Sequence, residues 1–127
     1  MMCRRGRSGG AVPKILVVDD DEGVRTTVCD LLELAGYECE RACDGEQALE
    51  LLAPDIDGML LDLAMPKMDG FAVLDALSDW PVVIVMSAFE YWNQRETEAR
   101  YGNRVSAFLR KPVPPPVLLD TVKTYIG

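Results

Sequence analysis

Apolar residues in this chain gather in short runs, and polar segments separate them. Three runs are almost continuously apolar, which is typical of strands covered on both faces: Ile15–Val18, Gly58–Leu63 and Pro81–Ser87. A more polar run at Tyr37–Ala42 predicts a strand at the edge of the sheet, and Ala107–Arg110 predicts a short last strand. Five strands are therefore expected.

Between these runs the apolar residues recur every three or four positions, as they do on one face of a helix. Helices are predicted at Gly23–Ala35, Asp44–Leu52, Phe71–Leu77 and Glu90–Tyr101, and in the closing segment "PPPVLLDTVKTYIG". The regular alternation of strand and helix predicts an α/β fold, in which a parallel sheet carries helices on both faces.

Length and charge narrow the classes of protein that fit. The 127 residues suit one domain, with residues 1–13 as a flexible basic tail and residues 14–127 as the folded part. The tail has no apolar core of an export signal and no run is long enough for a membrane span, so a cytoplasmic location is expected. Without the three arginines of the tail, ten basic residues face twenty-one acidic ones, a net charge of −11. Such a body repels phosphate backbones, and direct nucleic-acid binding is not expected.

Cysteine and histidine usage excludes the common zinc sites. The cysteines Cys3, Cys29, Cys39 and Cys43 contain no CxxC pair, and the chain has no histidine. We expect free reduced thiols. Any imidazole in the chemistry of this protein must come from a partner.

Polar residues fall where the predicted strands end. Asp19 and Asp20 follow the first strand, Asp62 lies at the end of the third, Ser87 ends the fourth, and Lys111 follows the fifth. The carboxyl ends of parallel strands lie at one edge of a sheet, where open α/β sheets bind their ligands. We therefore expect these five side chains to converge.

Three carboxylates in one pocket repel each other, by about 4 kcal/mol for a pair about 4 Å apart at an intermediate dielectric constant. A hard divalent ion with oxygen ligands, Mg²⁺ or Mn²⁺, answers this repulsion, and Lys111 adds a fixed positive charge. A metal ion, a lysine and a hydroxyl group together can hold a phosphoryl group. Asp62 can then act as the nucleophile that forms an acyl phosphate.

Four motifs, "ILVVDDDE", "LLDLAMPKMDG", "VIVMSA" and "FLRKP", occur in the order and close to the spacing of a known family. From Lys14 to Ile126 the chain resembles the receiver domain of two-component response regulators, the chemotaxis regulators among them. The resemblance implies a flavodoxin-like, doubly wound (βα)5 fold with a five-stranded parallel sheet in the strand order 2-1-3-4-5.

The resemblance also implies roles for single residues. Asp62 would be the phosphoacceptor, and Asp19 and Asp20 would hold the metal ion together with Asp62 and the backbone carbonyl of Ala64. Ser87 would hydrogen-bond to the phosphoryl group once it is present.

Lys111 would pair with Asp62 and the phosphoryl oxygens, and Pro112 would follow a cis peptide bond. Phe108 matches the aromatic switch residue, which couples the site to a surface made by the fourth helix, the fifth strand and the fifth helix. The expected phosphodonor is a sensor histidine kinase or a histidine phosphotransfer protein. The same surface is the candidate for a homodimer contact.

The chain also departs from the family pattern. The interval from Asp62 to Ser87 is short, and the segment "YGNRVSAFLRKP" holds about two extra residues, both next to the switch surface. Ala64 and Phe89 occupy positions that often help to place the hydrolytic water, and neither side chain can hydrogen-bond to it. Slow loss of the phosphoryl group is therefore predicted.

Two other functions use similar sheets. An aspartate-nucleophile phosphatase of the haloacid dehalogenase type would need a second acid two residues after its nucleophile, but Leu63 and Ala64 follow Asp62. A flavodoxin-like flavin carrier would need a loop of Ser, Thr and Gly after the first strand, and here that loop is acidic. Asp21 and Glu22 in this loop fit the start of a helix, where negative charge is favoured.

Overall fold

The computed structural model describes residues 12–63, 65, 70–77, 80–88 and 94–127. Over these residues five strands alternate with five helices. The strands are β1 (Lys14–Val18), β2 (Glu38–Ala42), β3 (Gly58–Leu61), β4 (Val82–Ser87) and β5 (Ala107–Arg110). The helices are α1 (Glu22–Leu34), α2 (Gly45–Leu51), α3 (Gly70–Ala76), α4 (Gln94–Tyr101) and α5 (Pro115–Tyr125).

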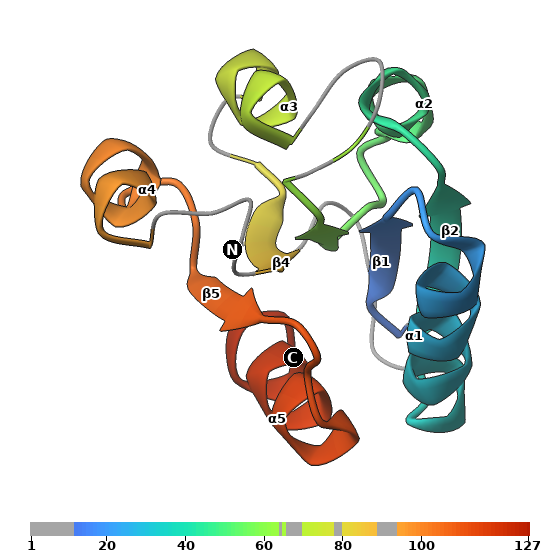
Figure 1. Ribbon diagram of the computed structural model, residues 1–127. Coiled ribbons are helices and arrows are strands. Elements are labelled where there is room, and N and C mark those ends of the chain that lie inside the picture. Colours follow the sequence, from blue (N-terminus) through green and yellow to red (C-terminus); the bar gives the residue numbers. More distant parts are fainter. Residues whose placement is uncertain (1–11, 64, 66–69, 78–79, 89–93) are drawn as a thin grey trace.

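The strands form one parallel sheet in the order β2-β1-β3-β4-β5, which confirms the predicted order. Helices α1 and α5 cover one face of this sheet, and α2, α3 and α4 lie on the other face (Figure 1). The polar strand β2 is at an edge, as its composition predicted. The fold is therefore the expected doubly wound α/β sandwich.

Alternate residues of the inner strands point into two separate cores. In β1, Ile15 and Val17 face α1 and α5, while Leu16 and Val18 face the other layer. The α1–α5 core consists of Ile15, Val17, Val28, Cys29, Leu32, Leu60, Ile84, Met86, Leu118, Val122 and Ile126. Because both faces are buried, the inner strands need unbroken apolar runs, and this need explains the sequence pattern.

Side-chain caps set the starts of the first two helices. The Asp21 carboxylate accepts a hydrogen bond from the Val24 amide (3.1 Å), and the Asp44 carboxylate accepts one from the Gln47 amide (2.8 Å). Such caps satisfy amide groups that a helix leaves unpaired at its start. At the other end of α1, Gly36 adopts a positive φ of 101°, which a residue without a side chain tolerates best.

Several bounds differ from the prediction by one residue, such as the start of α1 at Glu22 instead of Gly23. Strand β3 ends at Leu61 instead of Leu63, because the chain leaves the sheet after Asp62 and the Leu63 carbonyl accepts a hydrogen bond from the Gly70 amide (3.0 Å). Helix α4 is described from Gln94, and the first part of the predicted helix, residues 90–93, lies outside the described residues. None of the described helices is long and apolar enough to cross a membrane.

Candidate functional site

The strand order brings four of the polar strand ends together. Strands β1, β3, β4 and β5 are consecutive neighbours in the sheet, and all run in the same direction. Asp19 directly follows β1, Asp62 directly follows β3, Ser87 is the last residue of β4, and Lys111 directly follows β5. The amide of Asp62 donates to the Val18 carbonyl (3.0 Å), so backbone hydrogen bonds fix the relative positions of these ends.

Three carboxylates share this edge. Carboxylate oxygens of Asp19, Asp20 and Asp62 all lie within 4.8 Å of one another. Asp19 and Asp62 are buried, with 1% and 5% of their surface exposed, whereas Asp20 is exposed. Two of the acids therefore form the floor of the site, and the third reaches it from the solvent side.

The turn that carries Asp19 is held by its own neighbours. The Asp21 amide donates to Asp19 Oδ1 (2.9 Å), and the Arg25 guanidinium donates to the Asp19 carbonyl (2.7 Å). Arg25 was not singled out from the sequence, although its place on the first turns of α1 puts it within reach of this turn. These bonds fix the orientation of the Asp19 carboxylate.

The ammonium group of Lys111 lies between two of the acids. Its Nζ atom is 2.6 Å from Asp19 Oδ2 and 3.3 Å from Asp62 Oδ2. Burial opposes the charge on this lysine, but its hydrogen bond to Asp19 and the charges of Asp62 and Asp19 outweigh burial, so the pKa of Lys111 is raised. The lysine is therefore a fixed cation across the pH range in which cells live.

The Ser87 hydroxyl is fully buried, and among the described residues its Oγ has no hydrogen-bond partner. A buried hydroxyl without a partner costs free energy, and native structures rarely keep one without a reason. The backbone carbonyl of Ser87 accepts a hydrogen bond from the Lys111 amide (2.9 Å), so the two residues are adjacent. A phosphoryl oxygen bound at this edge would supply the acceptor that the hydroxyl needs.

The donor set fits Mg²⁺ or Mn²⁺. The candidate ligands among the described residues are carboxylate oxygens, which hard divalent ions prefer, and one lysine neutralises only one of the three acids. The exposed Asp20 leaves room for the waters that Mg²⁺ usually keeps. Asp19, Asp20 and Asp62 would hold such an ion.

Three further residues, Pro112, Phe108 and Ala64, were expected from the sequence to belong to the site or to the switch. The peptide bond between Lys111 and Pro112 is cis. Phe108 is half-buried and packs against the core under α2, α3 and α4, which includes Tyr101 and Val105. Ala64, whose carbonyl was expected to bind the metal ion, lies outside the described residues.

Gly70 supports the site and was not recognised from the sequence. A Cβ atom on Gly70 would lie 2.5 Å from the Asp62 carbonyl oxygen and 2.6 Å from the Cα atom of Leu63. Real contacts of this kind are not that short, so any side chain at position 70 would push the segment that carries Asp62. The only sequence signal was the "MDG" motif, whose glycine is the first residue of α3.

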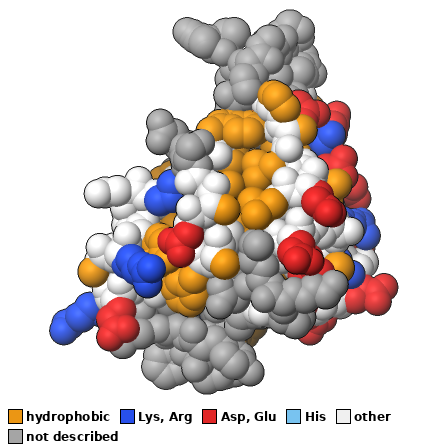
Figure 2. Space-filling model, turned by 90° about the horizontal axis from the view of Figure 1, so that it is seen from above, with side chains coloured by type: hydrophobic (Ala, Val, Ile, Leu, Met, Phe, Trp, Pro, Cys, Tyr) orange, Lys and Arg blue, Asp and Glu red, His pale blue; other side chains and the backbone are white. Residues whose placement is uncertain are grey.

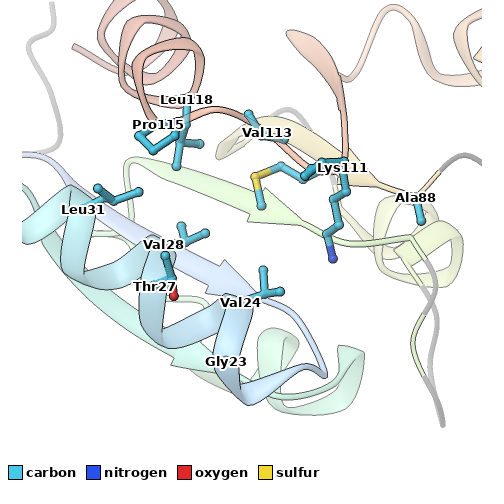
Figure 3. A pocket seen from close by; sticks show the side chains of 12 residues that line it. Gly23, Val24, Thr27, Val28, Leu31, Ala88, Lys111, Val113, Pro115 and Leu118 are labelled. Carbon is cyan, nitrogen blue, oxygen red and sulfur yellow. The ribbon is translucent and has the colours of Figure 1, made fainter.

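An apolar groove of about 590 Å³ runs beside the site, between α1 and α5. Figure 3 shows Val24, Val28 and Leu31 of α1 facing Leu118 of α5 across it, with Lys111 near one end. The acidic edge of the sheet is thus bordered by an apolar surface.

The chain matches the family model of the response regulator receiver domain over residues 15–123. The probable transcriptional regulator ycf27 of Porphyridium aerugineum is 32% identical over 117 residues, which cover 89% of this chain and 48% of that protein. The transcriptional regulatory protein CpxR of Escherichia coli (strain K12) is 50% identical over 64 residues, which cover 50% of this chain and 28% of CpxR. The chain therefore spans less than half the length of these relatives.

Solved structures that resemble this chain include a chemotaxis protein and a response regulator receiver protein. The chemotaxis protein CheY4 of Vibrio cholerae has a TM-score of 0.79 and 28% identity, covering 91% of this chain and 99% of that one. A response regulator receiver protein of Burkholderia phymatum has a TM-score of 0.79 and 31% identity, covering 91% and 95%.

The flavodoxin-like fold and the acidic residues at the strand ends are typical of one class of signalling domain. This chain belongs to the response regulator receiver domain family of two-component systems. It is a signalling switch, and neither the phosphatase nor the flavin-carrier alternative is supported.

Proposed function

We propose that Asp62 is the phosphoacceptor of this receiver domain. The observation that carries the proposal is the placement of the Lys111 ammonium group between the Asp19 and Asp62 carboxylates. The Lys111 amide bonds to the Ser87 carbonyl, and the Ser87 hydroxyl has no partner among the described residues. Asp62 is buried, so its carboxylate is kept there at a cost that a structural role does not explain. The Asp62 carboxylate as nucleophile, the Lys111 ammonium group and the Ser87 hydroxyl would then surround the position of the phosphoryl group at the sheet edge.

The donor of the phosphoryl group is proposed to be a phosphohistidine of a sensor histidine kinase or of a histidine phosphotransfer protein, because the chain has no histidine of its own. A carboxylate oxygen of Asp62 attacks phosphorus, the P–O bond forms, and the P–N bond breaks. The freed imidazole of the partner then takes up a proton. The apolar groove between α1 and α5 gives such a partner a surface to contact beside the site.

Asp19, Asp20, Asp62 and the Ala64 carbonyl are proposed to hold Mg²⁺ or Mn²⁺, whose charge would offset that of the carboxylates and phosphoryl oxygens. Lys111 would pair with a phosphoryl oxygen, and the Ser87 hydroxyl would donate to another. Water then attacks the acyl phosphate at phosphorus, which releases inorganic phosphate and restores the Asp62 carboxylate. The domain would in this way assist its own phosphorylation and dephosphorylation.

The signal is proposed to leave through the surface of α4, β5 and α5. Lys111 follows β5 directly, and Phe108 lies three residues earlier on the same strand, so a shift of Ser87 and Lys111 toward a phosphoryl group would be transmitted to Phe108. The same surface is the candidate for a homodimer contact. This proposal explains how a local charge change would reach a distant face.

The relatives CpxR and ycf27 carry names of transcriptional regulators, and this chain spans less than half of either. We propose that any DNA contact belongs to a part outside this domain, because the domain is acidic. In Figure 2 acidic side chains are concentrated along the right-hand margin of the face seen from above, with some basic ones among them. A cytoplasmic location remains a prediction from the sequence.

The proposal is tested with a small phosphodonor. Acetyl phosphate and Mg²⁺ should add one phosphoryl group to the protein, as measured by intact mass, and hydroxylamine should remove it, because acyl phosphates react with this nucleophile. A label that resists hydroxylamine would point to a hydroxyl ester and contradict the proposal.

A further inference from the structure

Cys29 and Cys39 are two free thiols that lie in contact, on elements that carry none of the acidic site residues. Cys29 lies on α1 and is fully buried in the α1–α5 core. Cys39 lies on the edge strand β2, is half-buried, and packs against the same core. The Cys39 thiol donates to the backbone carbonyl of Cys29 at 3.9 Å. The two thiol side chains also interact with each other.

The fold explains why these two residues meet. Helix α1 ends at Leu34, the chain turns through Gly36, and the Tyr37 amide donates back to the Leu32 carbonyl (3.0 Å). Strand β2 then runs beneath the helix and pairs Cys39 with Ile15 of β1. The contact therefore follows from a tight connection between helix and strand, and the two cysteines are only ten positions apart in the sequence.

Each of the two thiols also shifts the pKa of the other. The hydrogen bond from Cys39 lowers the pKa of Cys29 against the opposing effect of burial, and the charge of Arg41 acts in the same direction. The pKa of Cys39 is raised, first by its hydrogen bond to Cys29 and then by burial. The Cys29 thiol is therefore the more readily ionised of the two.

We propose that Cys29 and Cys39 form an oxidisable dithiol, which a peroxide converts into an intramolecular disulfide that fastens α1 to β2. A peroxide first oxidises one of the two thiols to a sulfenic acid and is itself reduced, in the case of hydrogen peroxide to water. The second thiol then attacks that sulfur, the S–S bond forms, the S–O bond breaks, and a second water leaves with the remaining proton. Two thiols and one hydrogen peroxide thus give one disulfide and two waters.

Cys43 provides a matched comparison from the same part of the chain. It is exposed, follows β2 directly, and its thiol lies 3.8 Å from the Asp44 carboxylate. Its sulfur has no thiol partner among the described residues. Cys43 should therefore remain available for alkylation after peroxide has closed the Cys29 and Cys39 pair.

The sequence allows a direct test. Trypsin cleaves after Arg25 and after Arg41, so the peptide Thr26–Arg41 carries Cys29 and Cys39 and no other cysteine. The full chain is treated with hydrogen peroxide and then alkylated with iodoacetamide under denaturing conditions. It is digested with trypsin, and the peptide masses are measured by mass spectrometry. We expect this peptide to be two hydrogens lighter than its reduced form and to carry no alkyl group, and reduction before alkylation should restore two alkyl groups.

Two results would overturn the proposal. One is a doubly alkylated peptide after an exposure that fully oxidises free dithiothreitol in the same tube, and the other is a peptide that carries added oxygen in place of the disulfide. Cys39→Ser should abolish the mass change, while Cys43→Ser should retain it. A rise in Tm after peroxide in the wild type and in Cys43→Ser, absent from Cys39→Ser, is the second expected readout.

The assay uses no phosphoryl transfer. Its outcome is therefore independent of the role proposed for Asp62.

Discussion

Lys111 lies closer to Asp19 than to Asp62, with Nζ to Oδ2 distances of 2.6 Å and 3.3 Å. The lysine therefore holds the buried Asp19 carboxylate more closely than it holds the Asp62 carboxylate. The charge of the lysine also relieves the repulsion between the two buried acids.

Removal of this lysine should destabilise the domain. Lys111→Ala leaves the buried Asp19 carboxylate without its closest cation, and breaking a buried ion pair in this way costs about 3 kcal/mol. Mg²⁺ should recover part of this loss, because the ion supplies the charge that the side chain no longer provides. Urea unfolding with and without Mg²⁺ measures both effects, and an equal Mg²⁺ response in wild type and variant would contradict the metal assignment.

Ser87→Ala should separate stability from function. The hydroxyl has no hydrogen-bond partner among the described residues, so its removal should change the free energy of unfolding by less than about 1 kcal/mol. Binding of beryllofluoride, which imitates the phosphoryl group, should weaken by about tenfold or more, as expected for a lost hydrogen bond to a charged group. A large loss of stability together with unchanged beryllofluoride binding would show that the hydroxyl has a structural role instead.

Gly70→Ala should displace the segment that carries Asp62 without changing any charge in the site. The new methyl group would meet the Asp62 carbonyl at 2.5 Å, so the segment must shift, at a cost of about 1 to 3 kcal/mol. Phosphorylation by acetyl phosphate should slow in parallel. Gly23→Ala is the control, since the methyl group there meets only the Asp21 carboxylate at 3.3 Å, and it should label at the wild-type rate.

The phosphorylated domain should lose its phosphoryl group slowly. Ala64 and Phe89, which lie outside the described residues, have side chains that cannot hydrogen-bond to the attacking water. Ala64→Asn and Phe89→Glu should each raise the autodephosphorylation rate, measured as phosphate release after removal of the donor. A wild-type rate already equal to that of the variants would refute this idea.

The sequence predicted the element order and the convergence of Asp19, Asp62 and Lys111, because apolar periodicity and strand direction are local signals. The strand order followed only from the family resemblance. Contacts that depend on the path of the loops could not be read from the sequence. The hydrogen bond of Arg25 to the Asp19 carbonyl and the close approach of Gly70 to Asp62 depend on how loops pack, and periodicity carries no information about this packing.

The role of Asp62 is the central claim, and strand β3 offers a matched control for it. Asp57 precedes this strand and is as deeply buried as Asp62, and its carboxylate accepts a hydrogen bond from the Lys14 amide (2.9 Å), which asparagine can also accept. The direct test compares Mg²⁺-dependent labelling by acetyl phosphate in wild type, Asp62→Asn and Asp57→Asn. We predict that Asp62→Asn takes up no label and that Asp57→Asn is labelled as fully as the wild type, whereas equal labelling of wild type and Asp62→Asn would contradict the account.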